Sequence, residues 1–128
     1  MPPVKATGKA EWFTYFPDDY RWSASVCMLI SAAQWGGSDI GEVDRVGRVL
    51  RKRIGDDELW FREWIKMGGQ VRALGMAEER RGNRLSAAAY FKRACLYYQI
   101  GDRFRQPKDK RRLAPSGHRW IASTATFA

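Results

Sequence analysis

A chain of 128 residues, 45% of them hydrophobic and 13% aromatic, can build the core of one folded domain, so the composition excludes wholesale disorder. The formal net charge of +9 permits binding to nucleic acid or to an anionic surface, but a solvated basic surface accounts for the same balance. A single histidine and two cysteines argue against a zinc cluster, and we expect no metal site.

Two features bear on where the protein resides. Cys27 and Cys95 are far apart in apolar helical segments, which is typical of buried, reduced thiols. The N-terminus lacks the apolar stretch of a secretory signal, and the longest apolar run, VCMLI, is far too short to span a bilayer. We therefore expect a cytoplasmic protein with no membrane partner.

The N-terminal third predicts an extended segment followed by one helix. Prolines and a glycine interrupt residues 1–19, and Asp18 or Asp19 can cap a helix that begins at Tyr20. This helix is expected to run to Trp35, where two glycines end it. Its apolar side chains fall on one broad face, made of Trp22, Val26, Leu29, Ala33 and Ile30.

A second helix is predicted from Ser38 or Asp39, either of which can cap it, to about Ile54. Its inner stripe is Val43, Val46, Leu50 and Ile54. Cationic side chains gather towards its C-terminal end, where the helix dipole favours them. These cations fit a solvated helix face, and they also fit a patch that binds an anion or a nucleic acid.

The third and fourth helices are predicted to form an antiparallel, TPR-like hairpin, which makes the fold all-α with about four helices. The third runs from about Glu58 to Arg81 with a seam of Trp60, Trp64, Met67, Val71 and Leu74. Gly68 and Gly69 within it allow another helix to approach closely, or mark a bend. The fourth covers residues 82–102, where Ala87 and Ala94 leave room and Phe91 fills it. A helical domain is thus expected over residues 20–112, and an irregular, poorly ordered tail over 113–128.

Motifs that carry chemistry are not found. The sequence contains no G-x-S-x-G, G-x-x-x-x-G-K-[ST], H-E-x-x-H or C-x-x-C pattern. The histidine, His118, lies in the Ser/Thr/Ala-rich tail without plausible partners, and the paired carboxylates precede helices, where capping explains them. We therefore predict no catalytic residue, no metal ligand and no cofactor.

Three long segments carry a resemblance to a known family. They read EWFTYFPDDYRWSASV, AQWGGSDIGEVDRVGRVLRKRIGDDELWFREW and GNRLSAAAYFKRACLYYQIGDRFRQPKD. Over residues 11–110 the chain resembles the N-terminal helical region of α/β-hydrolases similar to dihydropseudooxynicotine hydrolase. The resemblance implies a cap over a C-terminal α/β-hydrolase core, which hydrolyses an ester or a C–C bond beside a carbonyl with a catalytic serine.

None of the core's catalytic residues has a counterpart in this chain, so the resemblance implies a cap without its core, inactive alone. The expected partner is that α/β-hydrolase core, and a small-molecule substrate is expected only in a full-length protein. After QPKDKRR the sequence departs from the family's pattern, as a frameshift, a truncated reading frame or a genuine short form would make it.

A cap needs an apolar or aromatic underside towards the substrate. The candidates for lining the substrate pocket are Tyr20, Trp22, Trp35, Tyr97 and Phe104, although ordinary packing among the four helices is the more common reason for such rings. Without the core, exposed rings would make the chain prone to self-association, so a homo-oligomer is also expected. Two other hypotheses remain: a small basic helical protein that binds nucleic acid, and a helical hairpin that binds another protein.

Overall fold

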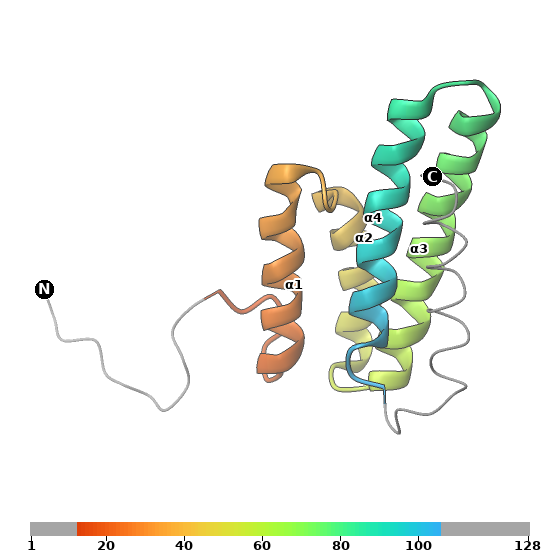
Figure 1. The fold of residues 1–128 in the computed structure, drawn as a ribbon. Helices are drawn as coiled ribbons and strands as arrows, with labels where there is room; N and C mark the ends of the chain where they lie inside the picture. Colours follow the sequence, from red (N-terminus) through yellow and green to blue (C-terminus); the bar gives the residue numbers. More distant parts are fainter. Residues whose placement is uncertain (1–12, 106–128) are drawn as a thin grey trace, which may run out of the picture.

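The computed structural model describes residues 13–105, so predictions for the N-terminal twelve residues and for the tail beyond residue 105 lie outside it. The described part is all-α, as predicted, and contains no strand. Its elements in chain order are α1 (Tyr20–Ala32), η1 (Ala33–Trp35), α2 (Ile40–Leu50), η2 (Arg51–Arg53), α3 (Asp57–Arg80) and α4 (Arg84–Asp102), where η denotes a short 3-10 helix (Figure 1).

Aspartates start the first three α-helices. The carboxylates of Asp19, Asp39 and Asp56 accept hydrogen bonds from backbone N–H groups in the first turns of α1, α2 and α3, at 3.0, 3.1 and 3.1 Å. Each carboxylate thereby satisfies one of the N–H groups that a helix leaves without a partner. The capping predictions for the first two helices are confirmed, and the structure selects Asp19 and Asp39 from the two predicted pairs.

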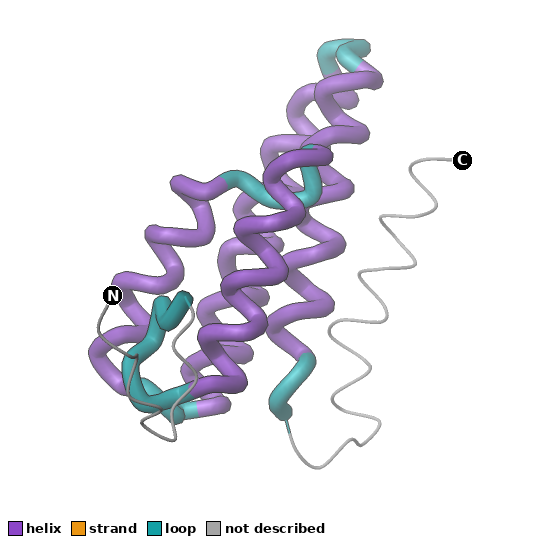
Figure 2. Tube along the Cα trace, turned by 90° about the vertical axis from the view of Figure 1, so that its left-hand side faces the viewer, coloured by secondary structure: helices purple, strands orange, loops and turns teal. Residues whose placement is uncertain are grey.

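The helices form a bundle with one projecting arm. Helices α3 and α4 lie antiparallel along their length, and their connected ends extend beyond α1 and α2 (Figure 1). Helix α1 lies at one edge of the bundle. Figure 2 faces that edge, and no other described helix stands in front of α1. The arm and the outer side of α1 are thus among the parts of the bundle that other described helices leave uncovered.

Glycines let α3 and α4 approach each other closely. A β-carbon on Gly68 would lie 2.7 Å from the Tyr98 ring, and one on Gly75 would lie 2.7 Å from the Phe91 ring. Such distances are too short for a carbon–carbon contact, so both rings occupy the space that a side chain would need. The prediction of a close helical approach at Gly68 is confirmed, and Phe91 fills the seam as expected.

Two predicted inner positions were wrong. Leu74 is 49% exposed, because the step of three residues from Val71 turns it away from α4, whereas the step of four brings Gly75 against Phe91. Ile54 is 37% exposed, because α2 ends at Leu50 and the chain turns before reaching it. Both errors come from extending a stripe by one further turn.

The core is a continuous series of aromatic rings. Phe16 contacts Trp22 at 5.2 Å between ring centroids, and Trp22 contacts Trp60 at 4.9 Å. The series continues through Trp64 to Tyr97, which stack at 5.7 Å. All five rings are buried, so they join the segment before α1 to α3 and α4.

None of the helices within residues 13–105 is both long enough and apolar enough to cross a bilayer.

Candidate functional site

The five predicted pocket residues fall into two groups. Trp22 and Tyr97 are fully enclosed in the helical core. Tyr20 and Trp35, in contrast, are 67% and 58% exposed, and Phe104 is half-buried against Trp60 at 5.3 Å between ring centroids. The described structure does not gather the five around one cavity, and their role towards a substrate stays a prediction.

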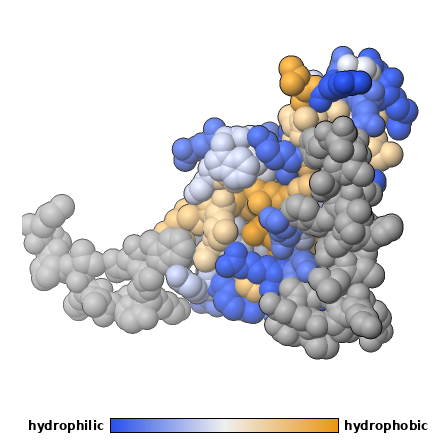
Figure 3. Space-filling model, in the orientation of Figure 1, coloured by the Kyte–Doolittle hydropathy of each residue, from blue (hydrophilic) through white to orange (hydrophobic). Residues whose placement is uncertain are grey.

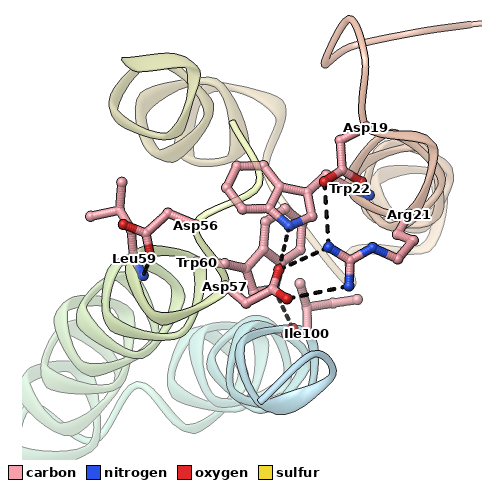
Figure 4. Close-up of polar contacts among 8 residues, drawn as sticks. All are labelled: Asp19, Arg21, Trp22, Asp56, Asp57, Leu59, Trp60 and Ile100. Carbon is pink, nitrogen blue, oxygen red and sulfur yellow. Dashed lines mark hydrogen bonds and ion pairs between the residues drawn. The ribbon is translucent and has the colours of Figure 1, made fainter. Parts of the chain in front are cut away.

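Trp22 belongs to a polar junction at the start of α3 (Figure 4). Its indole N–H donates to Oδ1 of Asp57 at 3.0 Å, and the Arg21 guanidinium binds both oxygens of the same carboxylate at 3.1 and 3.2 Å. Arg21 also reaches Asp19 at 3.4 Å and lies over the ring of Phe104 at 4.9 Å. The carboxylate also lies in the first turn of α3, where the helix dipole favours negative charge. This junction fixes α1 against α3.

Tyr97 belongs to a second polar group, inside the bundle. Its hydroxyl donates to Glu42 at 2.8 Å and accepts the N–H of Asp39 at 3.0 Å, while Arg93 binds both Glu42 oxygens at 2.9 and 3.0 Å. Burial, together with the bond to Glu42, raises the pKa of Tyr97 well above its usual range. Because these bonds join the start of α2 to α4, the group holds those two helices together.

The Glu42–Arg93 pair was missed from the sequence. Its partners are 51 positions apart, so no local pattern connects them. One signal existed: Glu42 lies four residues before Val46, so helical spacing places its carboxylate on the buried side of α2. A charge at such a position needs a partner, and Arg93, between Tyr90 and Tyr97, was a reasonable candidate.

The basic end of α2 is partly occupied by local partners. Tyr15 donates its hydroxyl to Asp44 at 2.6 Å, Arg48 binds the other oxygen of that carboxylate at 2.8 Å, and Arg51 covers the Tyr15 ring at 4.2 Å. Burial and the bond to Asp44 raise the pKa of Tyr15 to about 12, and the same bond lowers the pKa of Asp44. These contacts explain part of the basic run without a nucleic acid.

A shallow cavity of about 250 Å³ lies between α2 and α3. Val46, Val49 and Met67 supply its apolar lining, and Arg45 and Lys66 are among the charged residues around it. Pockets that enclose drug-sized ligands usually have volumes from about 300 Å³ upwards. None of the predicted pocket residues contributes to this cavity.

Residues 13–105 contain no cluster of three or more His, Cys, Asp or Glu side chains that could hold a metal ion. The chain's one histidine, His118, lies outside that range. What the described surface does offer is apolar area: Figure 3 shows hydrophobic side chains over α1, between α1 and α4, and at the tip of the arm.

Comparison with known proteins points to a hydrolase. The chain is 29% identical over 104 residues to a protein named Hydrolase acrC from Aspergillus aculeatus. The alignment covers 80% of this chain but 24% of the fungal protein, so the chain spans about a quarter of that relative's length. No family model matches the chain, and no solved structure matches it. This chain is therefore similar to part of a hydrolase.

Proposed function

We propose that this chain is the helical cap of an α/β-hydrolase, which covers the catalytic core and shapes the route to the substrate. The proposal is carried by the alignment with a quarter of a fungal hydrolase, in which most of the chain finds a counterpart. It is supported by the described residues, which form helices and expose apolar side chains.

The projecting arm is the part of the chain that we assign to the core. η1 meets α4 where the Lys92 ammonium donates to the Trp35 carbonyl at 3.0 Å, so the α4 residues before Lys92 lie beyond that contact. This part of the hairpin exposes Leu74, Met76 and Leu85, the last at 90%. Fully burying such a side chain stabilises a contact by about 1.5–3 kcal/mol. A body that covered the arm would therefore gain several kcal/mol from these three residues.

A cap acts on hydrolysis through binding and exclusion. Its closed position keeps bulk water from the reacting groups, and its side chains limit which substrates reach them. In this proposal the catalytic serine, acid and histidine belong to the core. The helices of this chain supply walls, and the Asp57 and Glu42 groups hold those walls rigid by tying α1 to α3 and α2 to α4.

A chimaera of the fungal hydrolase tests the proposal. Its aligned segment is replaced by the matching 104 residues of this chain, and hydrolysis of a chromogenic ester is measured beside the unmodified enzyme and a variant that lacks the segment. We expect activity in the chimaera, none in the deletion variant, and none in the isolated chain. A folded chimaera as inactive as the deletion variant, or steady turnover by the isolated chain, would contradict the proposal.

A further inference from the structure

Helix α1 and η1 differ from the other helices in carrying almost no charge. Within Tyr20–Trp35 the one charged residue is Arg21, and its guanidinium is already bound to Asp57. A helix on the surface of a bundle normally carries charged and polar side chains on its outer side, whereas a helix that is hydrophobic all round is buried. This segment lies between the two cases, because its outer side carries uncharged polar and apolar residues and no charge.

The inner side of this segment is buried in the bundle, whereas the outer side is partly exposed, with the Arg103 guanidinium 3.2 Å from the Met28 sulfur. Trp22, Val26 and Leu29 are enclosed by the bundle. On the outer side Met28 is 54% exposed, and the cysteine before it is half-buried. Helical spacing gathers five uncharged side chains on this outer face of α1, which are Tyr20, Ala24, Cys27, Met28 and Ser31. A sixth, Trp35, follows on η1, where its ring lies beside Gly37 and 5.6 Å from the Lys92 ammonium.

The sizes of these six side chains follow the same order in both directions. Counted outwards from the point between Cys27 and Met28, a small residue follows on each side at equal distance, and then an aromatic ring at equal distance. A two-fold axis through that point would place Tyr20 of one copy opposite Trp35 of another, and Ala24 opposite Ser31. An interface between identical chains around a two-fold axis must be complementary to itself in this way.

We propose that the outer face of α1 binds a second copy of this chain, with the two α1 helices antiparallel about a two-fold axis between Cys27 and Met28. The small side chains of Ala24 and Ser31 leave room for the helices to approach, and each large ring packs beside the partner's opposite ring. This assigns Tyr20 and Trp35 to a subunit interface instead of a substrate pocket. The inference goes beyond the cap proposal, because it concerns a different surface from the arm.

The expected strength of the dimer follows from its size. A segment of 16 residues is about 24 Å long, and one such pair of helices buries less than the roughly 800 Å² per partner of a standard interface. We therefore expect a dissociation constant on the order of 1–100 μM. Sedimentation equilibrium of the full chain under reducing conditions covers that range.

Matched charge substitutions identify the face. Met28→Glu places a carboxylate at the axis in both copies, and we expect the dissociation constant to rise about a hundredfold or more, because two like charges would be buried together. Leu85→Glu introduces the same charge at an exposed position on α4 and should leave the dissociation constant of the dimer unchanged. The Arg103 guanidinium lies 3.2 Å from the Met28 sulfur, so it would neutralise part of the charge of a glutamate at position 28. Ser31→Glu therefore repeats the test at a second outer position, one turn further along α1. Far-UV circular dichroism checks that the variants keep their helices.

A thiol cross-linker tests the position of the axis. Because Cys27 lies beside it, the two Cys27 thiols should lie within reach of a short bismaleimide, whereas Cys95 is on α4. We expect a covalent dimer from the wild-type chain and from Cys95→Ser, and its loss in Cys27→Ser.

Three results would overturn the proposal: a monomer throughout the concentration range, a covalent dimer that requires Cys95, and a dimer that survives both Met28→Glu and Ser31→Glu. The first leaves the cap proposal intact, since that proposal is tested by the activity of the chimaera.

Discussion

Two adjacent glycines of α3 give a sharp test of how closely α3 and α4 pack. A β-carbon on Gly68 would lie 2.7 Å from the buried Tyr98 ring, whereas one on Gly69 would lie 3.8 Å from the Tyr98 hydroxyl, which is an ordinary contact. Replacing a glycine in the interior of a helix by alanine stabilises the helix by about 1 kcal/mol. Gly69→Ala should show that gain. At Gly68 the same gain is opposed by overpacking, which costs about 1–3 kcal/mol.

The difference between the two variants isolates the overlap, because the helix term is the same in both. We expect Gly68→Ala to be about 1–3 kcal/mol less stable than Gly69→Ala. For a domain of this size each kcal/mol moves the melting temperature by about 4–8 °C, and urea unfolding followed by tryptophan fluorescence gives the free energies. Equal stabilisation by both substitutions would refute the described contact between Gly68 and Tyr98.

A double-mutant cycle attributes the cost to its source. Tyr98→Leu removes the ring that occupies the space above Gly68, so Gly68→Ala in that background should stabilise the chain as Gly69→Ala does. The interaction energy of the cycle should then be about as large as the difference between the two single alanine variants. An interaction energy near zero would show that the cost at Gly68 arises somewhere other than at Tyr98.

Further predictions concern the buried polar groups. Glu42→Ala should lower the free energy of unfolding by about 3 kcal/mol in urea titrations, because it leaves the Arg93 guanidinium without its partner. Tyr97→Phe should cost about 1–3 kcal/mol in the same assay, since it removes the bonds to Glu42 and Asp39. Stability should also fall as the pH rises from about 10 towards 12, because unfolded tyrosine loses its proton near pH 10 while the folded chain holds that of Tyr15 with a pKa of about 12. Tyr15→Phe should reduce this fall, and urea midpoints at pH 8 and pH 11 measure it.

Local features of the sequence predicted the elements well. A capping aspartate, a glycine that can adopt a positive φ such as Gly36, and a helical stripe act within a few residues of one another, so a single segment contains the whole signal. Leu74 shows where prediction from local features fails. Whether Leu74 or Gly75 faces α4 depends on which ring of α4 arrives there, and Phe91 is 16 positions further along the chain than Gly75.

The candidate site was harder to predict, because the sequence alone does not distinguish an aromatic side chain in the core from one that lines a pocket. Trp22 and Tyr97 were both assigned to the pocket, and both are enclosed. What marks them as core residues is a polar partner distant in sequence. Asp57 accepts the bond of the Trp22 indole, and Glu42 accepts that of the Tyr97 phenol. Buried indole and phenol groups need such partners, but the sequence does not show which carboxylate will supply the bond.

The two ends of the α3–α4 hairpin are stabilised differently, and this difference separates the two proposed surfaces. At one end Asp57 binds α1, and the Trp60 indole donates to the Ile100 carbonyl at 2.8 Å, so several helices are joined there. Beyond Lys92 the arm depends mainly on contacts such as Gly75 with Phe91. A partner on the arm would therefore stabilise residues that the bundle supports least, and hydrogen exchange should slow there. A second copy on α1 would leave exchange in the arm unchanged, so the two interactions can be told apart in the same full chain.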